Sequence, residues 1–158
     1  GAALQTGHDY AKEKNADYII HFDGDGQFDP KDIIPALKYL KEKKADILFG
    51  SRFLDGRSNV PWLKKYILLP GSQVVNTFFG LGLSDVHNGF RILTKNAFSQ
   101  IQITQDRMAH ATEIEMETKR LGLNYVEFPV KVVYHEFGQG LKGGISILKD
   151  LILHIFIR

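Results

Sequence analysis

Short apolar runs and amphipathic stretches follow one another along the chain and predict strands and helices in turn. The apolar runs that predict strands lie at residues 18–22, 46–50, 90–94 and 125–134. Helical spacing of apolar positions predicts helices at residues 2–14, 30–44, 96–101, 110–121 and 145–157, and residues 62–81 form a further apolar segment. This alternation predicts an α/β fold with a mostly parallel sheet flanked by helices.

Individual residues indicate where these predicted helices and strands begin, end or face the core. The residues that should face inward from the helix at 2–14 are Ala3, Leu4, Tyr10 and Ala11. Asp29 is expected to cap the next helix, with Pro30 at its first position. Pro129 interrupts the last predicted strand, which indicates a bend or a strand at the edge of the sheet.

Composition limits the classes of protein to which the chain can belong. Its 158 residues, 44% of them hydrophobic, suffice for one domain with a core. The lack of cysteine excludes disulfides, thiolate metal sites and a cysteine nucleophile, and a net charge of +2 argues against a nucleic-acid partner. No apolar run reaches the roughly 18–20 residues of a membrane-spanning helix. Because the helical pattern starts at Gly1, we expect part of a longer domain, truncated at the N-terminus.

An acidic, glycine-rich loop follows the first predicted strand, with Asp23, Asp25 and Gln27 at alternate positions. Two carboxylates and an amide oxygen at this spacing can converge on one hard divalent cation such as Mg²⁺ or Mn²⁺. Ligands of open α/β sheets bind beyond the carboxyl ends of the strands, where this loop lies. The alternative is a polar loop that only leads into the next helix. The crowded acids favour the cation site, because they repel one another without a cation.

Together with later segments, this loop gives the chain a family resemblance. The segments are Asp23-Gly-Asp25-Gly-Gln27-Phe-Asp29-Pro30, Gly50-Ser51-Arg52-Phe53, Asp85-Val-His-Asn88-Gly89-Phe90-Arg91, Met108-Ala-His110-Ala-Thr-Glu113-Ile114 and Val126-Glu127-Phe128-Pro129-Val130, followed by a glycine-rich stretch with Lys142. In this order they resemble family 2 glycosyltransferases, which have the GT-A (Rossmann-like) fold. The likeness is greatest to the polyprenol-phosphate mannosyltransferase-like and bacterial polysaccharide-biosynthesis members.

The resemblance covers residues 1–158 as a single domain that ends in an amphipathic helix at 145–157. It implies that this is the C-terminal two-thirds of the family's domain, with a strand, a helix and a second strand before Gly1. It also implies metal-assisted transfer of a sugar, with inversion, from a nucleoside-diphosphate sugar to a lipid-phosphate or glycan acceptor.

The resemblance further assigns roles to the acidic residues. Asp23, Asp25 and Gln27 would hold Mg²⁺ or Mn²⁺. Asp85 and Glu113 are the candidate catalytic bases for an acceptor hydroxyl, whereas a lipid phosphate needs no base. Glu113 is expected in the first turn of its helix, where a carboxylate also interacts favourably with the helix dipole.

Cationic and polar side chains near these acids are candidates for substrate binding: Arg52, Asn88, Arg91, His110 and Lys142. Arg52 can reach a phosphate or form a surface salt bridge. Arg91 lies inside an apolar strand and needs a carboxylate partner, for which Asp85 is the nearest candidate. Lys142 belongs to a glycine-rich loop that can close over a diphosphate or be merely flexible.

The helix at 145–157 is too short to span a bilayer, but it can lie at a membrane surface, contact a partner or pack on the core. We therefore expect a cytoplasmic enzyme at the inner face of the membrane, with a second copy of the chain as a candidate partner. His21 is expected to pack within its strand.

Two other functions are open. A sugar nucleotidyltransferase needs a phosphate loop, which the start of the chain does not show. A scaffold or oligomerisation module has no use for crowded carboxylates.

Overall fold

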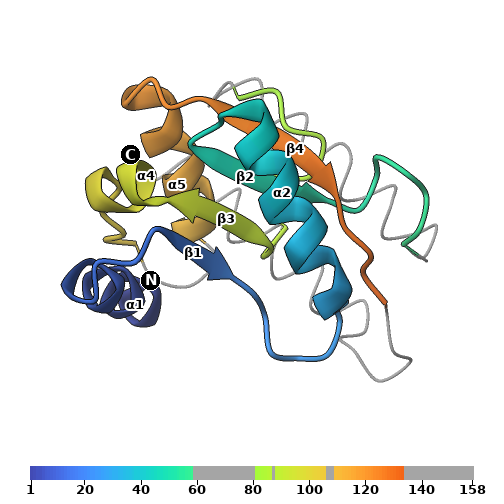
Figure 1. Cartoon of the computed structure of the whole chain (residues 1–158), viewed down its shortest axis with the longest axis horizontal. Helices are drawn as coiled ribbons and strands as arrows, with labels where there is room; N and C mark the ends of the chain where they lie inside the picture. Colours follow the sequence, from blue (N-terminus) through green and yellow to red (C-terminus); the bar gives the residue numbers. More distant parts are fainter. Residues whose placement is uncertain (59–80, 87, 106–108, 134–158) are drawn as a thin grey trace, which may run out of the picture.

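The computed structural model of the chain describes residues 1–58, 81–86, 88–105 and 109–133 (Figure 1). Within these ranges the helices are α1 (Ala2–Glu13), α2 (Ile33–Lys43), α4 (Lys95–Gln100) and α5 (Ala109–Arg120), and a 3₁₀ turn, η1 (Pro30–Asp32), precedes α2. The strands are β1 (Tyr18–His21), β2 (Ile47–Ser51), β3 (Arg91–Thr94) and β4 (Tyr125–Pro129). The expectations for residues 62–80, 135–144 and 145–157, Lys142 among them, lie outside the described residues.

The local signals in the sequence are confirmed where the structure describes them. The Asp29 side chain accepts a hydrogen bond from the Lys31 N–H at 3.0 Å, and Pro30 takes the first position of η1. Gly122 follows α5 at a φ of +63°, a left-handed conformation that glycine adopts without strain. β4 stops at Pro129 and is the last strand in the order of the described sheet, which is the expected edge position.

The described sheet has the order β1-β3-β2-β4. β1, β2 and β4 run in one direction, since β3 is antiparallel to both β1 and β2, and β4 is parallel to β2. The first two strands are therefore parallel as expected, but they are not neighbours. β3 lies between them, with Ile92 opposite Ile20 on one side and Leu48 on the other. As a result the ends of β1 and β2 and the start of β3 fall on one edge of the sheet (Figure 1).

Helices cover both faces of the sheet (Figure 1). On one face α1, α4 and α5 share a core with Ile47 and Phe49 of β2. On the other face Leu40 of α2 packs in a second core with Leu48 of β2. Successive residues of β2 thus point to opposite faces, as the pleat of a strand requires, and β2 is buried along its whole length.

α1 turns a different face to the core from the one that the apolar pattern predicts. His8 and Ala11 are buried, and Leu4 packs against the core one turn earlier. Tyr10 is 61% exposed and Ala3 is exposed as well, so the prediction of these two residues as inner positions was wrong. The reason is that a polar residue, His8, finds a buried partner on β1.

That partner is His21, and the two histidines join α1 to β1. Their Nε2 atoms lie 2.9 Å apart, so that one ring donates a hydrogen bond and the other accepts it. Burial lowers the pKa of His21 to about 3, with a contribution from the positive charge of Arg91, and burial also lowers the pKa of His8. The expectation that His21 packs within its strand is confirmed, since it is buried.

Acidification is expected to weaken the fold through this pair, beginning near pH 6.5. Both imidazoles are neutral in the native chain and gain a proton on unfolding below that pH, so the unfolded state binds more protons and stability falls with pH. His21 contributes about 1.4 kcal/mol per pH unit, or about 2 kcal/mol between pH 6.5 and 5. Glu115, whose raised pKa of about 8 keeps it protonated in the native chain, contributes with the opposite sign over this range, so the effect of the histidines is read from the difference between wild type and variant. Urea unfolding of the wild type and His21→Asn across this range measures the slope, and an unchanged slope in the variant would rule the pair out as its source.

Candidate active site

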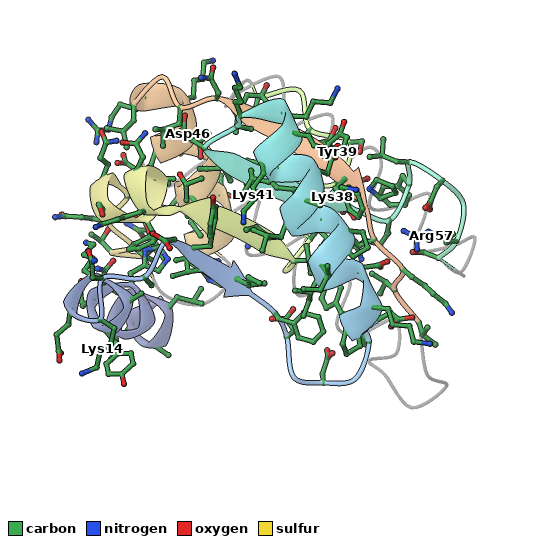
Figure 2. All side chains as sticks on the ribbon, in the orientation of Figure 1. Lys14, Lys38, Tyr39, Lys41, Asp46 and Arg57 are labelled. Carbon is green, nitrogen blue, oxygen red and sulfur yellow. The ribbon has the colours of Figure 1, made fainter. Side chains whose placement is uncertain are left out.

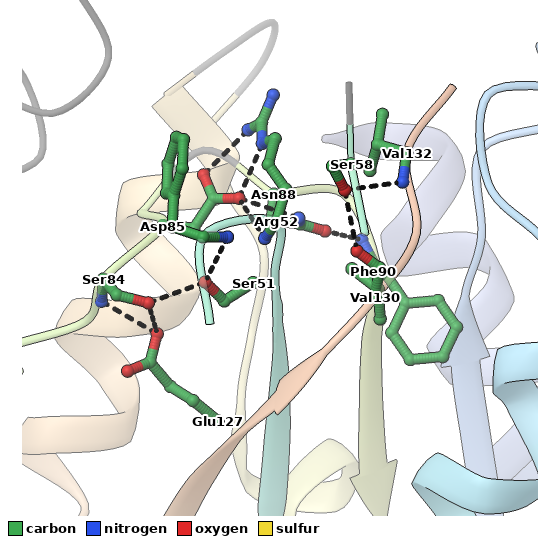
Figure 3. A network of polar contacts seen from close by, with 11 residues as sticks. Ser51, Arg52, Ser58, Ser84, Asp85, Asn88, Phe90, Glu127, Val130 and Val132 are labelled. Carbon is green, nitrogen blue, oxygen red and sulfur yellow. Dashed lines mark hydrogen bonds and ion pairs between the residues drawn. The ribbon is translucent and has the colours of Figure 1, made fainter. Parts of the chain in front are cut away.

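One edge of the sheet brings together most of the residues that the sequence singled out. Asp23 comes shortly after β1 and Arg52 directly after β2. Asp85 and Asn88 lie on the segment that leads into β3, and Arg91 is the first residue of β3. Figure 3 shows Arg52, Asp85 and Asn88 turned toward one another at this edge.

The acidic loop is an exposed turn whose backbone is fixed by hydrogen bonds. Asp25 Oδ1 accepts a hydrogen bond from the Gln27 N–H at 2.9 Å, which closes the turn. The Gln27 carbonyl accepts one from the Val133 N–H at 2.9 Å, so the segment after β4 anchors the end of the loop. Asp23 and Asp25 are both exposed. Their carboxylates are therefore accessible to a ligand on a turn of defined shape.

The donor set of this loop fits a hard divalent cation that keeps positions open for a substrate. It consists of the carboxylates of Asp23 and Asp25 and the amide oxygen of Gln27. In the part of the chain that the structure describes, no group of three or more histidine or acidic side chains is placed to hold a metal. Mg²⁺ needs no such group, because one or two carboxylates together with water and substrate phosphates usually bind it.

Gly89 provides the surface against which Asp23 lies. A Cβ atom added to Gly89 would stand 2.2 Å from Oδ2 and 2.9 Å from Cγ of Asp23, so the Asp23 carboxylate would have to move to make room for it. The contact places the first acid of the loop beside the segment that enters β3. Close approach is therefore the reason for glycine at position 89.

Gly89→Ala is expected to displace the Asp23 carboxylate and to weaken joint binding of Mn²⁺ and a nucleoside diphosphate on the order of tenfold. Gly24→Ala, in the loop itself, is the matched control, because a Cβ there meets no atom within 4 Å. Isothermal titration of both variants with Mn²⁺ and UDP or GDP measures the difference. Equal affinities of the two variants would contradict a role of Gly89 in placing Asp23.

Arg52 and Asp85 form a buried ion pair at the centre of this edge (Figure 3). Arg52 Nε lies 2.6 Å from Asp85 Oδ2 and Nη2 lies 2.8 Å from Oδ1, and the Arg52 backbone N–H also donates to Oδ2. Asn88 donates to Asp85 through Nδ2 at 2.9 Å and accepts from the Phe90 N–H. Arg52 thus forms a salt bridge, which was the alternative to a phosphate contact, although this salt bridge is largely buried rather than at the surface. The expected pairing of Asp85 with Arg91 was wrong, because the guanidinium at the end of β2 reaches both carboxylate oxygens.

A second polar group beside the ion pair was not anticipated from the sequence. Glu127 of β4 accepts hydrogen bonds from the N–H and the hydroxyl of Ser84, at 2.8 and 2.7 Å. Ser84 Oγ also lies 2.6 Å from Ser51 Oγ at the end of β2 (Figure 3). β4 therefore fixes the residue that precedes Asp85. The segment around Glu127 carried the family resemblance, but nothing in its local pattern indicated this partner.

Arg91 is buried at the start of β3 and forms no ion pair among the described residues. Its Nε has no hydrogen-bond partner, and its guanidinium lies 6.0 Å from the centre of the Phe49 ring. Burial lowers the pKa of Arg91, and the negative charges of Glu115, Asp23 and Asp85 oppose that effect. Arg91 thus lies within reach of the charges of acids from three segments.

Glu113, a candidate catalytic base from the sequence, lies on α5 and forms hydrogen bonds with a neighbouring segment. The helix begins at Ala109, so Glu113 does not lie in its first turn as predicted. The Glu113 carboxylate accepts hydrogen bonds from the N–H groups of Thr104 and Gln105 and from the Thr104 hydroxyl, and so holds the segment between α4 and α5. His110 is half-buried near the start of α5.

The buried acid of α5 is Glu115, which sequence reasoning missed. Its Oε1 has no hydrogen-bond partner. Burial raises the pKa of Glu115 to about 8, although the positive charge of Arg91 opposes the rise. The signal was present in the sequence, because Ala111, Ile114, Glu115 and Thr118 have the spacing of one buried helix face.

A further ion pair is formed by Arg57, which is labelled in Figure 2, and it holds the loop after β2. Arg57 Nη1 lies 3.0 Å from Asp32 Oδ1, Nη2 donates to the Pro129 carbonyl at 2.6 Å, and the side chain also pairs with Asp55. Asp32 accepts in addition from the Lys131 N–H at 2.7 Å. η1, the end of β4 and the loop after β2 are joined at this point.

The fold and this edge define an α/β domain whose acids and arginines meet where such sheets bind ligands. Comparison with known proteins narrows the class: the profile described as Glycosyl transferase family 2 matches residues 1–102. An undecaprenyl-phosphate mannosyltransferase of Micrococcus luteus is 28% identical over 151 residues, which cover 92% of this chain and 61% of that protein. A UDP-N-acetylglucosamine–dolichyl-phosphate N-acetylglucosaminyltransferase of Methanococcus voltae is 30% identical over 151 residues, covering 93% of this chain and 60% of that protein.

The chain therefore belongs to glycosyl transferase family 2, and the family resemblance is confirmed. An uncharacterized protein of Methanocaldococcus jannaschii is also 30% identical over 161 residues, or 97% of this chain and 66% of that protein. The chain thus spans 60% to 66% of the length of these three relatives. Among the helices that the structure describes, none is both long and apolar enough to pass through a membrane.

Proposed function

We propose that the protein to which this chain belongs transfers a sugar from a nucleoside-diphosphate sugar to a lipid phosphate, with the help of Mg²⁺ or Mn²⁺. The observation that carries the proposal is the meeting of the acidic loop, the Arg52–Asp85 pair and Arg91 at one edge of the sheet. Two relatives, named for sugar transfer to undecaprenyl phosphate and to dolichyl phosphate, support the acceptor class.

The diphosphate of the donor would bind at the acidic loop. Asp23, Asp25 and Gln27 would hold the cation, which when bound neutralises the charge that builds up on the departing diphosphate. Arg91 adds a fixed positive charge whose field reaches Asp23. Lys142 and His110 remain candidate contacts to the substrates.

The hydrogen bonds of the two candidate bases favour a phosphate acceptor over a sugar hydroxyl. Asp85 accepts from Arg52 and Asn88, and Glu113 accepts from the segment between α4 and α5. Hydrogen-bond donors thus already occupy the oxygens of both carboxylates, which leaves these oxygens less available to accept the proton of a hydroxyl. A hydroxyl acceptor needs a base, whereas a phosphate is already an anion. We therefore assign Asp85 to positioning Arg52 and leave the attack to the acceptor itself.

In the proposed step, an oxygen of the lipid phosphate bonds to the anomeric carbon of the sugar while the bond from that carbon to the diphosphate breaks. The bonding electrons leave with the nucleoside diphosphate, and no proton is transferred. Attack from the side opposite the leaving group inverts the anomeric configuration. A lipid acceptor places the reaction at a membrane surface, in our proposal its cytoplasmic face, with residues 145–157 as the candidate contact.

Transfer assays with the full-length natural protein test this proposal. UDP-, GDP- and dTDP-sugars labelled in the sugar are incubated with Mn²⁺ and a short polyprenyl phosphate, with the same polyprenol lacking its phosphate as the matched acceptor. We expect one donor to give a labelled lipid, only with the phosphate and only with the metal. Transfer to the free alcohol, or no transfer from any donor, would contradict the proposal.

A further inference from the structure

Two buried polar groups near the acidic loop lack the hydrogen-bond partners that burial demands. Arg91 on β3 is 2% exposed and Glu115 on α5 is 3% exposed. Arg91 Nε and Glu115 Oε1 are buried atoms, and neither has a hydrogen-bond partner. Leaving such an atom unpaired costs on the order of 1–3 kcal/mol, and native proteins contain few of them. A ligand group that supplies the missing bonds would account for both.

Arg91 and Glu115 interact electrostatically but do not contact each other through a hydrogen bond or an ion pair. Among the charges that act on Arg91, that of Glu115 has the largest effect, and the charge of Arg91 has the largest effect on Glu115. Yet no hydrogen bond or ion pair links them in the described part of the chain, in contrast to Arg52 and Asp85. A buried donor and a buried acceptor are thus both available to a third group.

One hydroxyl group fits this combination. A hydroxyl can accept a hydrogen bond from the Arg91 Nε–H and donate its own to Glu115 Oε1. A phosphate oxygen can pair with Glu115 only while Glu115 keeps its own proton, whereas a hydroxyl can pair with either form of the acid. A phosphate would also add negative charge beside Asp23, whose charge already acts on Arg91. The chemistry of the pair therefore favours a hydroxyl-bearing ligand over a second phosphate.

The position of the pair relative to the acidic loop indicates which hydroxyl this is. Asp23 lies against Gly89, two residues before Arg91, so the pair is adjacent to the place proposed for the donor diphosphate. The sugar of the donor is joined directly to that diphosphate. We propose that Arg91 and Glu115 bind a hydroxyl of the transferred sugar and thereby help to select the donor, an assignment that rests on the proposed function.

Calorimetry that separates the sugar from the nucleotide tests this assignment in the full-length protein. UDP is compared with UDP-N-acetylglucosamine, and GDP with GDP-mannose, each with Mn²⁺. Glu115→Met should bind the nucleoside diphosphate as the wild type does, but its sugar ester by about tenfold or more less tightly. Glu115→Gln, which keeps a donor and an acceptor, should recover most of that loss. Glu117→Met is the matched control on the same helix, because Glu117 pairs with Arg120 at the surface.

Each other outcome of this titration overturns the assignment in a recognisable way. Equal affinity of the wild type and Glu115→Met for the nucleotide sugar means that a water molecule fills the two bonds, and the proposed function still stands. Equal losses for nucleotide and nucleotide sugar indicate a purely structural role. In the transfer assay, a change of Glu115→Met confined to KM for the polyprenyl phosphate places the pair on the acceptor side.

A second measurement does not depend on the folding of the variant. The wild type is titrated with monodeoxy analogues of whichever nucleotide sugar it binds, and the loss of one hydroxyl should weaken binding by about tenfold or more. Undiminished binding of every analogue overturns the assignment. A wild type that binds neither nucleotides nor nucleotide sugars contradicts the proposed function itself, and the assignment with it.

Discussion

Replacing Asp85 with asparagine should lower the free energy of unfolding by about 3–5 kcal/mol. The change keeps the shape of the side chain but removes the charge on which the donors of Arg52 and Asn88 converge. The Arg52 side chain is only 11% exposed and loses the charge that its Nε and Nη2 face. Urea unfolding followed by circular dichroism measures the loss.

A second aspartate–arginine pair provides the control for this prediction. Asp55 and Arg57 pair at the surface, with side chains 27% and 43% exposed, so Asp55→Asn should cost no more than about 1 kcal/mol. A clear excess for Asp85→Asn supports the buried pair as the element that holds the loop after β2 to the segment before β3. Equal losses in the two variants would mean that the pair does not hold this edge together.

Asp25→Asn should weaken the binding of Mn²⁺ in the presence of a nucleoside diphosphate on the order of 100-fold and leave the fold intact. Asparagine keeps the Oδ1 that accepts from the Gln27 N–H, so the turn still closes and only the charge is lost. Electron paramagnetic resonance of free Mn²⁺ measures the affinity, and the transfer assay measures the accompanying loss of turnover.

Asp29→Asn is the matched control in the same loop. Asp29 caps η1 through Oδ1 and lies outside the proposed donor set. Asparagine is an equally good cap, so neither stability nor Mn²⁺ affinity should change. If Asp25→Asn retains the Mn²⁺ affinity of the wild type, the acidic loop is not the metal site.

The elements of the fold were predictable because the hydrophobic periodicities of strands and helices follow from burial of one face or one stripe. The position of β3 between β1 and β2 was not predictable in this way. Local patterns determine which residues form a strand, whereas strand order depends on which edges the rest of the chain leaves open to pairing. The shared direction of β1 and β2 was therefore predictable, whereas the insertion of β3 between them was not.

The same distinction applies to the candidate site. Asp23 and Arg52 follow strands that run in one direction, so their meeting at one edge was predictable. Asp85 reaches the same edge because β3 is antiparallel to both of those strands. The partner of Asp85 depended on side-chain reach across that edge, which spacing along the chain does not contain, and the choice of Arg91 was wrong. Glu115 was within reach of sequence reasoning as an acid on the buried face of α5. The roles of these residues toward metal and substrates stay predictions.

Calorimetric titration of the full-length natural protein with nucleotide sugars, with and without Mn²⁺, tests the central claim most directly. The claim is that the acidic loop after β1 forms a metal-dependent donor site. It predicts that one of the UDP-, GDP- or dTDP-sugars binds in Mn²⁺ and that EDTA abolishes this binding. Binding of equal strength in EDTA, or no binding of any of these donors in Mn²⁺, would contradict the claim.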